Sequence, residues 1–395
     1  MQYRARALTR AVSFLGLLLA LTGCTRVPEL SGMGTLLSAR DAAHGPLAST
    51  TAEALTLDQL QLKGSHNSYH QAPRMALAKG WRYSHLPLRK QLETQGVRQI
   101  ELDVRYSGGQ VVVGHLPIVD GRSSCRTLAA CLQQVKAWSD ENPSHLPLFV
   151  FLEPKEHITP SNLDGRLEVL DQTIAKVFPR SSLLTPRDVA GEERTLKEAV
   201  QAHGWPSLES TRGKVVFVLF GRKNHTRAYG EGRPRLEGRL MFAAGRPQDP
   251  YAVFASCDDP VAEKAEIAAA LDQGMLVRTR ADSDLRRDRN RRDAALASGA
   301  HFIGSDFVDP KSNWLALGER APARCNPLSG AACVSAALTE TPEDVVALGA
   351  NPALPAASAS PAVGTSASGS LVEERALLPL PANASATGKA PIGVP

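Results

Sequence analysis

The sequence predicts an α/β fold with a single (β/α)8 barrel of the TIM type, flanked by disordered N- and C-terminal tails. Short apolar segments alternate with helical patterns, which is typical of βαβ units and a parallel sheet. The expected folded segment, residues 56–337, has the length of one such barrel. Acidic, amide and imidazole side chains follow several apolar segments, at the strand ends where a barrel of this type builds its active site.

The composition sets the first limits on the class of protein. Of the 395 residues, 43% are hydrophobic and 22% are charged, which are ordinary values for a globular protein and exclude disorder throughout. The 45 Lys and Arg residues exceed the 40 Asp and Glu residues by a net charge of only +5. A chain of this length can bury a large core without help from disulfides.

The N-terminus predicts export. Residues 1–23 combine three arginines and no acid with an apolar run, 11–21, that is too short to span a membrane, as in a secretory signal peptide. The following Cys24 ends a Leu-Thr-Gly-Cys segment that resembles a bacterial lipobox, in which this cysteine is acylated. We therefore expect an exported protein, either anchored by lipid to the bacterial cell envelope, at the outer membrane if Gram-negative, or secreted. The alternative is an ordinary signal peptide with a chance cysteine.

The predicted tails differ in composition from the folded part. Residues 24–55 form a short tether, and residues 338–395 are rich in Ala, Pro, Ser and Gly, which cannot build a core. Between them, the expected strands in order are 60–63, 97–104, 111–114, 148–152, 215–220, either 240–243 or 253–255, 275–280 and 302–304. The expected helices are 128–138, 163–177, 261–271 and 284–297.

Five cysteines follow Cys24 in a protein whose export permits disulfides. We expect two local bridges, Cys125 with Cys131 and Cys325 with Cys333, and a free Cys257. The alternative is a zinc site, which is disfavoured because neither a Cys-x-x-Cys spacing nor a pattern of histidine partners is present.

Four successive strand ends carry acids, an amide or imidazoles. The period-two alternation of a strand sends Glu101, Asp103 and Arg105 to one side, and two carboxylates on one face of a buried strand are costly without a cation. Together the strand ends supply four oxygen donors, Asn67, Glu101, Asp103 and Glu153, and two imidazoles, His66 and His115. Oxygen ligands with three carboxylates suit Ca²⁺ better than Mg²⁺. Two imidazoles beside such a cation suit phosphodiester cleavage.

Each of these residues alone has a simpler explanation. A single acid at a strand end is more often a helix cap or a salt-bridge partner, and a lone histidine is more often structural. Six such groups on four successive strand ends are hard to explain by packing, so the set favours a functional site.

Four segments resemble the X-region motifs of calcium-dependent phosphoinositide-specific phospholipase C. These are Gly-Ser-His-Asn-Ser-Tyr at 64–69, Ile-Glu-Leu-Asp-Val at 100–104, Val-Gly-His at 113–115 and Phe-Leu-Glu-Pro-Lys at 151–155. The resemblance covers about residues 60–310 and is strongest to the bacterial branch that is secreted without regulatory domains. It implies a phosphoric diester hydrolase that acts, as a monomer without an obligatory protein partner, on a phospholipid at a membrane surface.

The resemblance also implies roles for individual residues. Asn67, Glu101, Asp103 and Glu153 correspond to calcium ligands, and His66 and His115 to the catalytic pair. The implied reaction is attack of the inositol 2-hydroxyl on phosphorus, which releases diacylglycerol and inositol 1,2-cyclic phosphate. Water then opens this product to inositol phosphate. His115 would protonate the leaving oxygen, and a carboxylate, Glu101 or Glu153, would act as base.

A second tier of cations is expected to bind the substrate. Lys155 shares a face with Glu153, and Arg278 and Arg280 lie two apart on the seventh expected strand, so both arginines can face a phosphate. For the arginines, an ion pair in the barrel core with Asp103, Glu153 or Asp282 is an equal alternative. Arg105 has the same ambiguity.

The segment 284–293 is rich in arginine and is expected to be a solvated helix with charge pairs at helical spacing. A patch for anionic lipid is the alternative, and nucleic-acid binding is disfavoured because no aromatic residues are interleaved with the charges.

Two other functions are open at this point. A glycerophosphodiester phosphodiesterase is disfavoured because His66 is followed by Asn-Ser and not by Arg-Gly. A non-catalytic lipid-binding lipoprotein is disfavoured because both histidines and all four oxygen donors are present.

Overall fold

The structure is a computed structural model, and it describes residues 55–155, 163–317 and 321–330 together with Cys333, Leu338 and Glu340. The predicted signal peptide, Cys24, the tether except Leu55, and nearly all of the predicted C-terminal tail lie outside the described residues. Within the described part, no helix has the length and apolarity required to cross a membrane. The predicted domain boundaries stay predictions.

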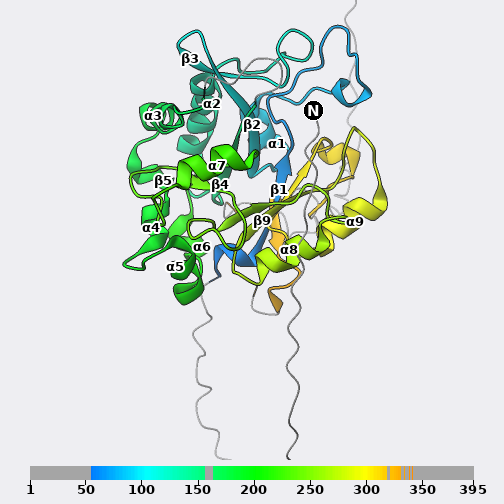
Figure 1. Cartoon of the computed structure of the whole chain (residues 1–395). Helices are drawn as coiled ribbons and strands as arrows, with labels where there is room; N and C mark the ends of the chain where they lie inside the picture. The colour runs from blue at the N-terminus through cyan, green and yellow to red at the C-terminus, as the bar shows by residue number, and fades with distance from the viewer. Residues whose placement is uncertain are drawn as a thin grey trace, which may run out of the picture. The chain divides into compact units, whose positions relative to one another are not determined.

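The central feature is a ring of parallel strands, as predicted (Figure 1). Each strand of the ring pairs with the next, and an isolated parallel bridge between Ala244 and Phe254 joins β7 to β8 and closes the ring. In order, its strands are β1 Leu60–Ser65, β2 Gln99–Ser107, β4 Leu148–Pro154, β6 Val215–Leu219, β7 Phe242–Ala243, β8 Phe254–Ser256, β9 Leu276–Arg280 and β10 Phe302–Ser305. The carboxyl ends of these strands therefore meet at one end of the barrel.

Two details of the predicted strand order are corrected. The expected strand 111–114 is β3 Gln110–Val113, which pairs antiparallel with β2 and is not part of the parallel ring. The turn between them is Gly108–Gly109 with φ of 58° and 80°, a tight hairpin, whereas parallel neighbours need a crossover of about a dozen residues or more. The ring is complete without β3, because the two segments expected as alternatives for the sixth strand, 240–243 and 253–255, both form strands, β7 and β8.

Two further short strands lie off the ring. β5 Leu183–Leu184 pairs in parallel with the beginning of β6, and β11 Ala323–Cys325 pairs antiparallel with the beginning of β1. β11 therefore lies at the N-terminal end of the barrel, away from the strand ends that carry the polar residues.

The helices surround the strands (Figure 1). They are α1 Leu88–Thr94, α2 Leu128–Glu141, α3 Glu168–Val177, α4 Pro186–Ala190, α5 Leu196–His203, α6 Leu208–Thr211, α7 Lys223–Gly230, α8 Lys264–Leu271 and α9 Arg289–Ala297. α2 shows why these segments form helices: the Thr127 side chain accepts from the Ala130 N–H at its N-cap, and Leu128, Leu132 and Val135 are buried at helical spacing. The four predicted helices exist, although α3, α8 and α9 begin later than expected.

The arginine-rich segment is only partly helical. Asp284 and Leu285 have φ of 53° and 55°, and α9 begins after Asp288, whose carboxylate accepts from two backbone N–H groups. The expectation that the helix begins at residue 284 was therefore wrong, because the left-handed residues break it and the better cap lies further along. Arg291 pairs with Asp259 at 2.7 Å, a partner outside the helix.

The interior of the barrel changes from apolar to polar along each strand. On β4, Phe149 and Phe151 point into an aromatic cluster with Phe302, whose ring lies 4.6 Å from that of Phe149. Two residues beyond Phe151 on the same face comes Glu153. The buried rings thus form a floor beneath the polar strand ends.

The predicted disulfides are confirmed. Cys125 bonds to Cys131 and Cys325 bonds to Cys333, while Cys257 is free and buried.

Candidate active site

Three carboxylates meet at the carboxyl ends of β2 and β4. Glu101 and Asp103 face inward from β2, Glu153 faces inward from β4, and one oxygen from each lies within 4.8 Å of the others. The register explains this: Asp103 pairs directly with Glu153 across the two strands. The three carboxylates predicted from the sequence are therefore brought to one place.

The middle carboxylate shows that the cluster suits a cation. Asp103 is fully buried, and neither of its oxygens accepts a hydrogen bond of normal geometry. Burial, with the adjacent charge of Glu101, raises the pKa of Asp103, and burial with Asp103 raises the pKa of Glu153. Buried carboxylates of this kind are stabilised by a hard divalent cation, and an all-oxygen set fits Ca²⁺.

Two basic side chains partly balance the acids. The Lys155 ammonium lies 2.7 Å from Glu153 and 3.5 Å from Asp103. Arg278, which is 1% exposed, pairs with Glu101 through one nitrogen and with Asp258 through another, above the ring of Phe220. For Arg278 the core ion pair predicted as the alternative describes the structure, although its partners are Glu101 and Asp258 and not the acids expected.

His66 lies at the end of β1 between two carboxylates. Its Nδ1 is 2.7 Å from Asp306 at the end of β10, and its Nε2 is 3.7 Å from Glu101. Arg280 lies 3.5 Å from the other oxygen of Asp306. Burial, followed by the charge of Arg280, lowers the pKa of His66 well below its ordinary value. The Asp306 contact fixes the ring with Nε2 toward the carboxylate cluster.

The turn after β1 places Asn67 beside the cluster. Asn67 has a φ of 45°, a left-handed conformation that Asn tolerates better than most residues. Its side-chain oxygen lies 3.3 Å from the Tyr69 hydroxyl that donates to it. The Ser68 hydroxyl accepts from the Glu101 N–H at 2.8 Å and so ties the turn to β2.

The base of this turn packs closely against β2. A Cβ on Gly64 would lie 1.9 Å from the side-chain oxygen of the buried Gln99, so a larger residue here would displace that side chain. The Gly-Ser-His-Asn-Ser-Tyr segment is therefore a packing unit as well as a source of polar groups.

His115 follows the β2–β3 hairpin and is held by a buried acid. Its Nδ1 lies 2.7 Å from Asp120, and the other oxygen of Asp120 lies 2.9 Å from Nε2 of His70. Burial alone would raise the pKa of Asp120, but the hydrogen bonds from His115 and His70 lower it. Arg105 donates to the backbone carbonyls of Gly114 and His115, so it fixes this turn and does not form the predicted core ion pair with Asp103, Glu153 or Asp282.

The sequence matches the model of a known enzyme family. The model of the family described as phosphoinositide phospholipase C, Ca2+-dependent, matches residues 55–111 and 106–327, well over half of the chain. The chain belongs to this family. The family indicated by the resemblance, the class of phosphoric diester hydrolase and calcium as the cofactor are thereby confirmed.

Solved structures of calcium-dependent phospholipases C share the fold. A calcium-dependent phosphoinositol-specific phospholipase C from Pseudomonas sp. is 19% identical with a TM-score of 0.51, covering 70% of this chain and 97% of its own. A Ca²⁺-dependent phosphatidylinositol-specific phospholipase C from Streptomyces antibioticus is 20% identical with a TM-score of 0.53, covering 69% of this chain and 100% of its own. At these identities the likeness establishes the barrel fold. Among curated proteins, none matches the chain.

Several residues of this phospholipase C site were missed from the sequence. Asp120, His70 and Asp258 are remote from their partners in the chain or lie in loops, so no strand pattern marks them. Asp282 was considered only as an arginine partner, but it accepts from the Ser305 hydroxyl, the Asp306 N–H and the Trp314 indole. Asp306 lies two residues beyond the expected strand 302–304, but nothing in the local sequence pattern shows that it holds His66.

Proposed function

We propose that this enzyme cleaves phosphatidylinositol-type lipids to diacylglycerol and inositol 1,2-cyclic phosphate, which water then opens to inositol phosphate. The observation that carries the proposal is the carboxylate cluster around Asp103, with His66 at its edge and His115 on the neighbouring turn. Glu101, Asp103 and Glu153, with the Asn67 amide, are the residues that would hold Ca²⁺. A bound Ca²⁺ would supply positive charge that lowers the pKa of a sugar hydroxyl and offsets the charge of the phosphate.

The two histidines take different parts in the proposed reaction. Asp120 accepts from Nδ1 of His115, so a protonated His115 presents its Nε2 proton to the leaving glycerol oxygen. Asp306 orients His66 in the same way, which directs its Nε2 toward the phosphate and the carboxylates. Of the two candidate bases, we favour Glu153, because its side chain is 20% exposed and can reach a substrate, whereas Glu101 is buried against Arg278.

The basic residues are assigned by their exposure. Arg280 and Lys155 are partly exposed at the strand ends, so we assign them to the phosphate and the inositol ring. Arg278 is buried between Glu101 and Asp258, and we assign it the task of positioning Glu101.

One assay tests this function. The purified protein is incubated with phosphatidylinositol and, separately, with glycerophosphoinositol, in Ca²⁺ or in a chelator, and the phosphorus products are identified by NMR. The proposal expects cyclic inositol phosphate from phosphatidylinositol, and only with Ca²⁺. Turnover of the deacylated diester alone would show a glycerophosphodiester phosphodiesterase, and turnover of neither would show a non-catalytic protein.

The catalytic assignments need a separate control. His66→Ala and His115→Ala should each remove activity while the circular dichroism spectrum and the unfolding midpoint stay close to those of the parent protein. Retained activity in either variant would refute its assignment.

We also propose that the protein is exported and anchored through an acylated Cys24. The support is the sequence alone: a short apolar run followed by Leu-Thr-Gly-Cys. Labelling of growing cells with a fatty-acid analogue should mark the parent protein and not Cys24→Ser. Equal labelling of both would refute the anchor.

A further inference from the structure

His70 is a buried histidine to which the proposed reaction gives no role. Its side chain is 1% exposed, and it follows directly after the turn that ends β1. An antiparallel bridge joins His70 to Ser123, and the Ser124 N–H donates to the Tyr69 carbonyl at 2.8 Å. This pairing holds the His70 ring against the loop that carries Asp120.

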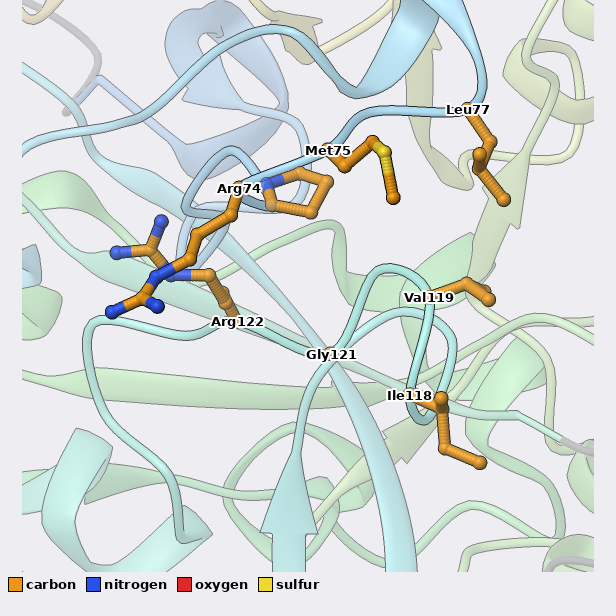
Figure 2. Close-up of a pocket in the computed structure, with 8 residues that line it drawn as sticks. Arg74, Met75, Leu77, Ile118, Val119, Gly121 and Arg122 are labelled. Carbon is orange, nitrogen blue, oxygen red and sulfur yellow. The ribbon is translucent and has the colours of Figure 1, made fainter. Parts of the chain in front are cut away.

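The two segments that meet at His70 also contact each other further along the chain. Arg122 donates to the Ala72 carbonyl at 2.7 Å. Residues of the segments 73–77 and 118–122 line one groove (Figure 2). These contacts fix the two segments to each other, so the position of the His70 ring is well determined.

Both ring nitrogens of His70 face acceptors. Nδ1 lies 3.0 Å from the Tyr83 carbonyl, which can only accept, so Nδ1 carries a proton. Nε2 lies 2.9 Å from one oxygen of Asp120, whose other oxygen lies 2.7 Å from Nδ1 of His115. A second proton therefore lies between Nε2 of His70 and Asp120, and it belongs to one of the two groups.

The properties of the two groups assign this proton to His70. The ordinary pKa of a histidine is about 6.5 and that of an aspartic acid is about 3.9, so the imidazole is the stronger base. Burial alone would raise the pKa of Asp120, but the hydrogen bonds from His115 and His70 lower it. The Tyr83 ring stacks on the His70 ring at 4.2 Å and 17°, a contact that favours a cation. Burial lowers the pKa of the nearby His85 to about 4, so that ring adds no competing charge.

A charged His70 is the counter-ion of Asp120. The pair is neutral as a whole, although Asp120 still accepts from Nδ1 of His115 and still orients that ring. His115 therefore has the orienting hydrogen bond without an unbalanced negative charge beside it.

The other histidine of the site has the same arrangement. Asp306 contacts His66 through one oxygen, and Arg280 lies 3.5 Å from its second oxygen. Arg280 is a permanent cation, and His70 takes the corresponding place at Asp120. Each of the two histidines is thus oriented by a carboxylate whose charge a cation balances.

We propose that His70 is a fixed imidazolium that balances Asp120 and so lets His115 give up its proton to the leaving oxygen. In that step the bond from phosphorus to the glycerol oxygen breaks, its electron pair stays on the oxygen, and the Nε2 proton of His115 moves there. An unbalanced Asp120 would stabilise the protonated ring and slow the transfer. His70 acts through Asp120, so it is a positioning residue. Its effect on turnover rests on the proposed function, whereas its charge does not.

The first test measures the charge of His70 directly. Full-length protein with ¹⁵N-labelled histidine rings is studied with Ca²⁺ at pH 7, where two-bond ¹H–¹⁵N correlations distinguish an imidazolium from either neutral tautomer. The His70 signal is assigned by its loss in His70→Gln, or by through-bond correlation to the backbone if that variant does not fold. His70 should show two protonated nitrogens.

His301 is the internal control in the same spectrum. Its Nδ1 accepts from the Val277 N–H at 3.0 Å, so this buried ring should be neutral. A neutral His70 beside a neutral His301 would overturn the proposal.

The second test measures whether the charge acts on the leaving oxygen. His70→Gln keeps an N–H donor for Asp120 and removes the charge. On a soluble short-chain phosphatidylinositol, kcat should fall about tenfold or more with little change in KM, because the acid step is impaired. On nitrophenyl inositol phosphate, whose leaving oxygen does not require a proton, kcat should fall less than about twofold. An equal loss on both substrates, or no loss on either, would refute the action through His115.

His145→Gln is the matched control for replacing a buried histidine. His145 precedes β4 at the opposite end of the barrel, and its ring contacts the Leu146 carbonyl and the Ser139 hydroxyl. This variant should unfold at a lower temperature but keep its kcat on both substrates. A loss confined to phosphatidylinositol in this variant as well would show that the pattern is not specific to His70.

The two tests separate this inference from the proposed function. An imidazolium at His70 in a protein that turns over neither substrate would refute the function and support only the ion pair with Asp120. Normal turnover by a parent protein with a neutral His70 would leave the function standing and refute the inference.

Discussion

Each of the two site histidines, His66 and His115, is held in position by a carboxylate behind its ring. Asp120 is fully buried, and its two oxygens accept from His115 and His70 at 2.7 and 2.9 Å. Asp306 does the same for His66. A buried carboxylate that accepts from Nδ1 selects the Nδ1–H tautomer and fixes the ring orientation, so the direction of each Nε2 atom is set by a residue behind the ring.

The replacement Asp120→Asn tests this dependence. An amide can accept from only one histidine and turns N–H groups toward the other, so the ring of His115 no longer keeps its tautomer. We expect kcat on phosphatidylinositol to fall roughly 10²- to 10⁴-fold with a much smaller change in KM, and the pH profile to shift. Steady-state kinetics across pH measures both effects.

A surface pair provides the matched control for that replacement. His203 and Glu193 lie 3.0 Å apart and are exposed, so Glu193→Gln breaks a histidine–carboxylate contact away from the site. Its kcat should stay within about twofold of the parent, since exposed pairs contribute little. A kcat loss for Asp120→Asn no larger than this would show that Asp120 has no positioning role.

His301 gives a pH dependence of stability. It is buried at the N-terminal side of β10, where Nδ1 accepts from the Val277 N–H at 3.0 Å and Nε2 lies 3.0 Å from the Asp58 carbonyl. Burial lowers its pKa from 6.5 to about 4. Between these values the unfolded chain takes up a proton that the folded chain does not, so the unfolding free energy decreases as pH falls, by about 3 kcal/mol across the window.

The replacement His301→Asn isolates this contribution. The amide oxygen can still accept from the Val277 N–H but cannot be protonated, so the variant should be less stable at pH 7 yet lose less stability on acidification. Urea unfolding of both proteins at several pH values between 7 and 4 gives the comparison. Parallel pH curves for the two proteins would contradict the assignment.

At the scale of elements, the turns after the strands decide where the site residues point. Gly221 follows β6 with a φ of 99°, and a Cβ at that position would lie 2.6 Å from Cγ of Glu153. The β6–α7 turn therefore forms a wall of the carboxylate cluster, and its closeness to Glu153 requires glycine.

The replacement Gly221→Ala should therefore disturb both backbone and site. We expect a loss of about 1 to 2 kcal/mol in unfolding free energy from the left-handed backbone, and a Ca²⁺ affinity lower by about tenfold because Glu153 must move. Gly191→Ala is the control, because its φ is 52° and no atom lies within 4 Å of the new Cβ. It should lose stability but keep its Ca²⁺ affinity by calorimetry; equal Ca²⁺ affinities in the two variants would contradict the role of Gly221.

At the scale of the whole molecule, the carboxylate cluster couples the metal to folding. The residues come from β2 and β4, so they meet only when the barrel is formed, and the unfolded chain offers no such site. An ion that binds only the folded state stabilises it, by about 2.7 kcal/mol when its free concentration is about 100 times Kd.

Calcium should thus raise the midpoint of thermal unfolding, and a chelator should lower it. Asp103→Asn should remove most of this shift, because Asp103 lies between the other two carboxylates, while Asp140→Asn, at an exposed acid paired with Lys136, should keep it. Differential scanning calorimetry with and without Ca²⁺ measures the shift independently of activity. A full shift in Asp103→Asn would place the ion elsewhere.

The sequence by itself determined those features of the protein that depend on local pattern. The alternation of apolar strands and helices predicted the parallel barrel, and the period of two predicted that Glu101 and Asp103 share a face. The close spacing of the cysteines predicted both disulfides. These features depend on neighbours along the chain, so the sequence contains them directly.

Only the tertiary structure decided the features that depend on distant segments. That β3 leaves the ring follows from a two-glycine hairpin and from the existence of both β7 and β8. Arg278 pairs with Glu101 across 177 positions of sequence, and His66 meets Asp306 across 240. The ends of strands remote in sequence meet only when the barrel closes, so charge pairing and hydrogen bonding there are settled by packing and not by local pattern.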